Sequence, residues 1–323
     1  MSAPLSHINP SILYIRKGKQ ANSILFGFCI DNRRKLYYVG NKIKPQRQEC
    51  QEGGTSMLSA LFTTQVPGTT TPEMLEECLQ DPSTMKWYIV PLFVIMTYFI
   101  ATELRSRNFN VLLGAAAYWL ADVFNETWNS MVYACTGQPV WGTTAAGGSA
   151  FQILIGYNIE ISIMFFILGM YACKLLKVSP DSEGLSFWDG NKNWKTDPNN
   201  MYYMFGEKNL TPEQKAIKKK AIRGRVLNIL VGAAMAVFIE ILLNLCGVLT
   251  WEKCWWQPTR PLILFIIGYC PFFTSAYIIH DLPRKKQLIG LGIQAAIVIG
   301  LLIVAGSMDM LGPQIPLGFP HMK

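Results

Sequence analysis

Long apolar runs separated by shorter polar segments dominate the last two thirds of this chain. A helix needs about 20 apolar residues, at 1.5 Å per residue, to cross the roughly 30 Å hydrocarbon core of a bilayer. The runs that meet this requirement lie at 86–104, 109–134, 150–176, 226–250, 261–281 and 287–308. The pattern therefore predicts an all-α fold, a polytopic integral membrane helix bundle with about six transmembrane helices.

Polarity divides the chain into three predicted parts. Residues 1–84 are polar and basic, so we expect a poorly ordered N-terminal extension. Residues 85–310 form the predicted transmembrane domain, which includes a long polar loop at 177–222, and residues 311–323 form a short C-terminal tail. Because Met85 directly precedes the first apolar run, the sequence leaves open whether residues 1–84 belong to the functional protein.

Basic residues gather in alternate loops of the predicted bundle. Charged residues make up only 15% of the chain, well below the roughly 25% of soluble domains. The cations concentrate at 105–108, 174–225 and 282–286, and the positive-inside rule predicts that these loops are cytoplasmic. A net charge of +8 also raises the question of nucleic acid, but cations that flank apolar runs are explained by topology. We therefore expect no nucleic-acid partner.

Acidic residues lie inside the predicted spans, where charge is costly. Asp122 and Glu126 lie on the second span, Glu160 on the third and Glu240 on the fourth. A carboxylate at mid-bilayer costs at least ~2.5 kcal/mol, so these groups should face the bundle interior and pair, protonate or contact water. Counted from the non-cytoplasmic ends of the spans, Glu126, Glu160 and Glu240 are expected at a common depth of about 12–15 Å.

Amides and aromatic rings accompany these acids at helical spacing. Tyr118, Asp122, Glu126 and Asn129 fall on one stripe of the second span. The sequence therefore predicts a polar, water-accessible cavity. Its candidate catalytic residues are Glu126, Glu160, Glu240 and Asp122, and its candidate substrate-binding residues are Asn129, Asn158, Asn244, Trp128 and Tyr118. No Lys or Arg lies at that depth, so at least one carboxyl group should hold a proton.

Metal and cofactor motifs are absent from the sequence. The chain has only His7, His280 and His321, which excludes histidine-rich metal sites, and it has no glycine-rich phosphate-binding motif. We therefore predict no metal and no cofactor. His280 and Asp281 close the fifth span beside Arg284, a position that favours a hydrated helix flank over a titrating gate.

A helix start is encoded before the fourth span. Thr211 is a capping residue, Pro212 suits the first turn, and Gln214 follows the cap by three positions. The basic stretch after it should be a helix that lies on the membrane surface or leads into the fourth span.

Three function classes fit these features. An integral membrane enzyme would use the carboxyl groups as acids on a lipid or isoprenoid substrate, with terpene cyclase-like or isomerase-like chemistry. A proton- or cation-coupled transporter or channel would use them as a relay, although the small bundle would then favour a homo-oligomer. A non-catalytic assembly or scaffold protein would use them as hydrogen-bonding contacts between helices. The sequence ranks the enzyme first without deciding the class, and the expected partners are the lipid bilayer and a lipid-like small molecule.

Overall fold

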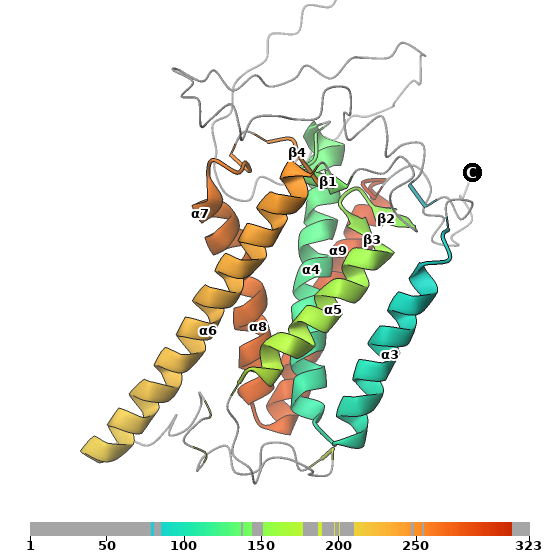
Figure 1. Cartoon of the computed structure of the whole chain (residues 1–323). Coiled ribbons are helices and arrows are strands. Elements are labelled where there is room, and N and C mark those ends of the chain that lie inside the picture. Colours follow the sequence, from blue (N-terminus) through green and yellow to red (C-terminus); the bar gives the residue numbers. More distant parts are fainter. Residues whose placement is uncertain are drawn as a thin grey trace, which may run out of the picture. The chain divides into compact units, whose positions relative to one another are not determined.

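A computed structural model describes residues 79–80, 85–136, 138–143, 151–176, 187–188, 197, 200, 210–246, 249–253 and 255–311. All of them lie in the second of two compact units, Met1–Lys42 and Ile43–Lys323. Long helical segments cross this second unit side by side (Figure 1). Most of the predicted extension and tail falls outside the described residues, so these two boundaries stay predictions.

The first three long helices are α3 (Ile89–Arg105), α4 (Phe109–Thr136) and α5 (Ile159–Lys174). A tight turn joins α3 to α4, and Arg107 adopts a left-handed backbone conformation there (φ 55°). The helix α4 lies at the centre and packs against α3, α5, α8 and α9. Its buried face therefore carries the predicted polar stripe into the middle of the bundle.

The helix α6 (Pro212–Leu245) is continuous from the basic stretch through the fourth predicted span. The side chain of Thr211 accepts a hydrogen bond from the backbone N–H of Gln214, and the Gln214 side chain accepts one from the N–H of Thr211. This reciprocal cap satisfies two backbone donors that a helix start leaves unpaired. The predicted helix start is confirmed, and the basic stretch leads directly into the span.

The fifth predicted span is a single helical segment with a local irregularity. It consists of α7 (Pro261–Ile263), the π-helical turn η3 (Leu264–Tyr269) and α8 (Cys270–Asp281). Pro271 lacks a backbone N–H and its ring crowds the carbonyl of Ile267, which accounts for a widened turn just before it. The segment ends at Asp281 because Pro283 holds Leu282 in an extended conformation. The last helix, α9, spans Arg284–Ser307.

Short strands at one end of the bundle were not predicted from the sequence. Strands β1 (Trp141–Thr143) and β4 (Leu249–Trp251) pair antiparallel, with Trp141 opposite Trp251. Strands β2 (Gln152–Leu154) and β3 (Tyr157–Asn158) form a hairpin that leads into α5, and Leu79 bridges to Gln152. We call this the Trp-rich end (138–143, 151–158 and 249–260) and the opposite one the basic end (105–108, 174–176, 212–225 and 282–286).

Apolar side chains cover the outer faces of several helices. Val94 on α3, Leu227 and Phe238 on α6, and Ile293 on α9 are all more than half exposed, although each is a residue that prefers an apolar environment. Within the described part of the chain, three helices are long and apolar enough to cross a membrane: Pro212–Leu245, Pro261–Asp281 and Arg284–Ser307. The structure is therefore that of a mainly helical protein with apolar helices suited to a bilayer.

Candidate functional site

Three of the four predicted carboxyl groups lie together in the bundle. Asp122 and Glu126 occupy successive turns of α4 and are buried, and Glu240 approaches them from α6 close enough to interact electrostatically with both. One oxygen of each group, Asp122 Oδ2, Glu126 Oε2 and Glu240 Oε2, is enclosed and has no hydrogen-bond partner among the described residues. The structure thus brings the carboxyl groups of α4 and α6 together, as the sequence predicted.

Aromatic side chains surround this carboxyl cluster (Asp122, Glu126 and Glu240). The hydroxyl group of Tyr269, at the end of η3, faces Glu240. Tyr118 is fully buried one turn from Asp122, and its ring contacts Phe165 of α5 and Phe272 of α8 at centroid distances of 5.9 and 5.4 Å. The cluster is thus polar only where the carboxyl and hydroxyl groups meet and is apolar around them. Tyr269 was not predicted, because the sequence prediction used only the acids of the second, third and fourth spans and their neighbours, and Tyr269 lies on the fifth.

Glu126 is held in place from the Trp-rich end. The indole N–H of Trp141 donates to Glu126 Oε1 at 2.8 Å, and Trp141 packs against Trp256 at a centroid distance of 5.0 Å. A Cβ atom at Gly156 would lie 2.6 Å from Glu126 Oε2, so the β2–β3 hairpin closes tightly over this carboxyl group. The predicted substrate-binding residue Trp128 lies beside Trp141 and remains about one third exposed (36%).

Glu160 is not among the described groups that act electrostatically on Asp122 or Glu126, so the structure does not bring it into the cluster. The predicted third span began at residue 150, but residues 152–158 form the hairpin and α5 begins only at Ile159. Glu160 consequently lies in the first turn of α5, where the hydroxyl group of Tyr88 donates to it. A negative side chain in this position complements the helix dipole. In the structure, Glu160 therefore stabilises the start of α5, next to the Trp-rich end.

The predicted amides make backbone contacts that support the fold. Asn129 accepts from the N–H of Val140 at 2.7 Å and donates to the carbonyl of Trp141 at 2.8 Å, which fixes the entry to β1. Asn158 caps α5 by accepting from the N–H of Ile161 at 2.8 Å, and Asn244 donates to the carbonyl of Leu249 at 3.0 Å. These contacts occupy groups that were predicted to bind substrate.

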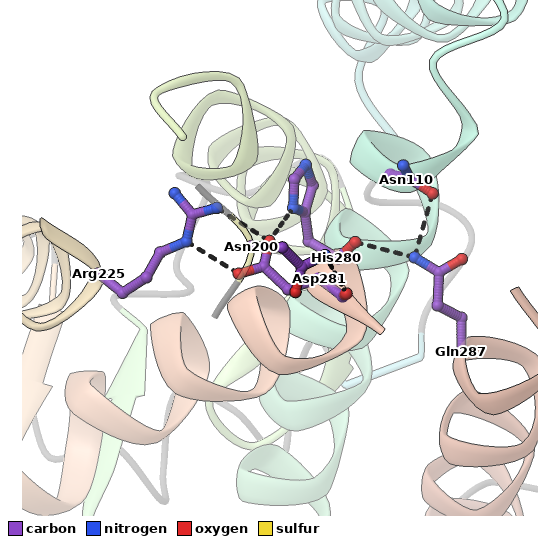
Figure 2. A network of polar contacts seen from close by, with 6 residues as sticks. All are labelled: Asn110, Asn200, Arg225, His280, Asp281 and Gln287. Carbon is purple, nitrogen blue, oxygen red and sulfur yellow. Dashed lines mark hydrogen bonds and ion pairs between the residues drawn. The ribbon is translucent and has the colours of Figure 1, made fainter. Parts of the chain in front are cut away.

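A second polar cluster lies at the basic end, where the hydrated-flank interpretation of His280 and Asp281 is wrong. Figure 2 shows Asp281 in a fork with Arg225 of α6, at 2.9 Å from Nε to Oδ2 and 3.0 Å from Nη2 to Oδ1. His280 Nδ1 lies 2.8 Å from Asp281 Oδ1, and the amide of Asn200 donates to the Asp281 carbonyl at 2.7 Å. All four residues are buried, so this is an interior charge network.

The network continues onto α4 and α9. Gln287 donates to Asn110 Oδ1 at 3.1 Å and to the carbonyl of His280 at 2.9 Å (Figure 2). Arg284 donates to Gln287 at 2.6 Å. Arg284 also donates to the carbonyl of Phe187 at 2.6 Å and lies over its ring. One feature of the sequence could have indicated this network: Arg225 is the last cation before a long apolar run.

The two clusters have different chemical capacities. Each charge of the Arg225–Asp281 pair is matched by its partner, which suits a structural role. The carboxyl cluster has no Lys or Arg among the described groups that act electrostatically on it, which suits the holding and transfer of protons. Among the described residues, no group of three or more His, Cys, Asp or Glu side chains is placed to hold a metal ion.

One family model covers all residues of both clusters except Asn200. The model of a family described as "Uncharacterized membrane protein family" matches residues 69–188 and 201–307. A protein of Archaeoglobus fulgidus described as "Uncharacterized protein" is 35% identical over 234 residues, which cover 72% of this chain and 93% of that relative. No solved structure matches the chain.

Proposed function

Because the chain belongs to the family described as "Uncharacterized membrane protein family", we propose that it crosses the membrane six times, with its basic end in the cytoplasm. The proposed spans are α3, α4, α5, α6, the α7–α8 segment and α9, which lie side by side in Figure 1. Their ends alternate between the basic end and the Trp-rich end. Positive charge favours the cytoplasmic side, and tryptophan favours the interfacial region of a membrane.

Cysteine labelling tests this topology. In a chain whose eight native cysteines are replaced, cysteines at Lys285 and Arg260 should label differently with an impermeant maleimide on intact cells. We expect Arg260→Cys to label directly and Lys285→Cys to label only after permeabilisation. Direct labelling of both positions would contradict the proposed odd number of crossings between them, and the reverse pattern would contradict the orientation.

The function that the geometry supports best is acid catalysis inside the membrane on a lipid or isoprenoid substrate. The observation that carries it is the carboxyl cluster, in which Asp122, Glu126 and Glu240 meet in aromatic surroundings with no described cation beside them. A carboxylic acid in such surroundings is able to donate its proton to a carbon–carbon double bond, since little else there competes for it. The resulting carbocation would be stabilised by the electron-rich faces of nearby rings such as Tyr118 and Phe165.

The contacts of the carboxyl groups suggest a division of roles. Glu126 accepts a hydrogen bond from Trp141, which suits a carboxylate that takes up a proton. Asp122 is deeply buried within electrostatic range of both Glu126 and Glu240 and suits the donor. Asp122 transfers its proton to the double bond, the Glu126 carboxylate takes a proton from the adjacent carbon, and return of that proton to Asp122 restores both groups, so the substrate is isomerised with no net change in protons. This cycle requires no cofactor.

Deuterium incorporation tests the proposal and does not require the substrate to be identified first. Purified protein is incubated in D2O with a total lipid extract of the cells that express it, and the lipids are analysed by mass spectrometry. We expect a lipid that gains deuterium with the wild type, and loss of at least about 100-fold in that rate with Asp122→Asn or Glu126→Gln, because a general acid or base contributes factors of this size. Glu160→Gln is the matched control and should retain the rate, since Glu160 lies away from the cluster. Equal loss in the control, or no labelled lipid at all, would contradict the enzyme.

A proton relay is the second candidate, and the position of Tyr277 favours it. Tyr118 lies within electrostatic range of both Asp122 and Tyr277. Tyr277 in turn lies within range of Asp281 and Arg225 at the basic end. The hydroxyl groups of Tyr118 and Tyr277 are therefore polar groups in the bundle between the two clusters, and the Tyr118 hydroxyl has no hydrogen-bond partner among the described residues. Proton flux into liposomes that Glu240→Gln abolishes, without any labelled lipid in D2O, would favour the relay. If the Gln and Asn variants change stability but neither lipid labelling nor proton flux, the result favours an assembly or scaffold protein.

A further inference from the structure

The start of α6 extends well beyond the thickness of a membrane. The helix has 34 residues, which corresponds to about 51 Å at 1.5 Å per residue. Its apolar part, residues 226–245, is about 30 Å long and by itself matches the hydrocarbon core. The remaining part, residues 212–225, therefore projects about 21 Å past the core at the basic end. In Figure 1 this start of α6, drawn in yellow, lies apart from the other helices.

The projecting segment (212–225) is rich in cations. It carries one acidic residue, Glu213, against six basic residues, Lys215, Lys218, Lys219, Lys220, Arg223 and Arg225. Arg225 is committed to the buried pair with Asp281, and Lys215, Lys219, Lys220 and Arg223 are exposed. The segment needs no tertiary contact to begin as a helix, because the Thr211 and Gln214 side chains cap it. It is a preformed helix whose exposed charge is almost entirely positive.

From this charge and position we propose that residues 212–225 form a docking surface for the headgroups of anionic phospholipids. The occupant follows from the geometry, because the cations begin where the apolar part of the helix ends, and Arg223, Lys220 and Lys219 lie within about 10 Å of the core, within side-chain reach of the lipid phosphates. Clusters of Lys and Arg next to a span attract anionic headgroups electrostatically. Lys215, Lys219 and Arg223 follow one another at i, i+4 and i+8, so the exposed cations present one face of the helix to the surrounding headgroups. Nothing in this inference depends on the proposed catalytic or relay activity.

Native mass spectrometry of the full-length protein tests this surface. The delipidated protein in detergent micelles is offered equal amounts of phosphatidylglycerol and phosphatidylcholine, and the bound lipids are counted. We expect a preference of at least about tenfold for phosphatidylglycerol in the wild type. The variant Lys215→Gln/Lys219→Gln/Lys220→Gln should lose most of it. The matched control Arg105→Gln/Lys285→Gln/Lys286→Gln removes the same charge elsewhere at the basic end and should retain it.

Several outcomes would overturn the inference. They are equal binding of both lipids by the wild type, equal loss in both triple variants, or retention of the preference in the variant of residues 212–225. A fourth is tighter binding of a short oligonucleotide or an acidic peptide than of phosphatidylglycerol. Should the α6 variant unfold, a salt titration of the wild type decides instead. The preference must then decline between low salt and about 1 M NaCl, where the screening length is only about 3 Å.

Discussion

Replacing Arg225 with alanine is expected to destabilise the protein by about 3–5 kcal/mol. The change leaves the Asp281 carboxylate buried at 1% exposure with its only described arginine partner removed. Removing one partner of a buried ion pair costs far more than the pair itself contributes, because the remaining carboxylate loses its forked arginine contact and keeps only weaker partners such as His280. The measurement is the free energy of unfolding of the detergent-solubilised protein in an SDS titration. Because the pair joins α6 to α8, we expect the α6 start to separate first.

Two control variants separate this effect from a general loss of charge or volume. Arg223→Ala removes an exposed cation two residues away on the same helix and should change stability by less than about 1 kcal/mol. Arg225→Met with Asp281→Leu removes both charges and should recover most of the loss, since a buried pair replaced by apolar residues is often neutral. His280 loses its carboxylate partner in this double variant. A loss for Arg225→Ala no greater than that for Arg223→Ala would contradict the prediction.

Replacing Gly169 with alanine is expected to cost about 1–3 kcal/mol, although alanine forms helices better than glycine. A Cβ atom at Gly169 would lie 2.7 Å from Tyr118 Cβ and 2.9 Å from Ala115 Cα, both of them rigid parts of α4. The helices α4 and α5 would have to move apart, and Tyr118 would shift beside the carboxyl cluster. Thermal unfolding monitored by thiol labelling of the buried Cys173, on the next turn of α5, reports the opening of this contact.

The matched control for Gly169 is Gly300→Ala on α9. A Cβ atom at Gly300 would meet nothing within 4 Å, so the variant should be neutral or stabilised by up to about 1 kcal/mol. Opposite signs for the two variants would show that the close approach of α4 and α5 decides the effect. Equal stability of both variants would contradict the packing of Gly169 against Ala115.

Features encoded by neighbouring residues could be predicted from the sequence. The apolar runs mark all the long helices, and the Thr211 and Gln214 pattern marks the start of α6. The stripe of Tyr118, Asp122 and Glu126 on α4 followed from helical spacing alone. Each of these features depends on residues within a few turns of one another and is therefore independent of how the helices pack.

The hairpin before α5 shows where the local pattern failed. Residues 150–158 are as apolar as a span, and periodicity by itself does not separate a short apolar strand from a buried helix. The pairing of β2 with β3 shifted the helix start to Ile159 and placed Glu160 at the Trp-rich end instead of beside Glu126. Asn129 was likewise assigned to substrate because its partner Val140 lies in the loop that folds over it, and Asn158 because the span was expected to begin before the helix that it caps.

The sequence by itself determined that this chain is a mainly helical membrane protein with acidic residues on the inner face of α4. The tertiary structure alone decided which charges meet. Glu240 joins Asp122 with no cation among the described residues beside them, whereas Asp281 joins Arg225, which lies 56 residues earlier in the chain. The physical reason is that burial and helical spacing are local properties of the sequence. The partner of a buried charge, in contrast, depends on which helices pack together and at what height.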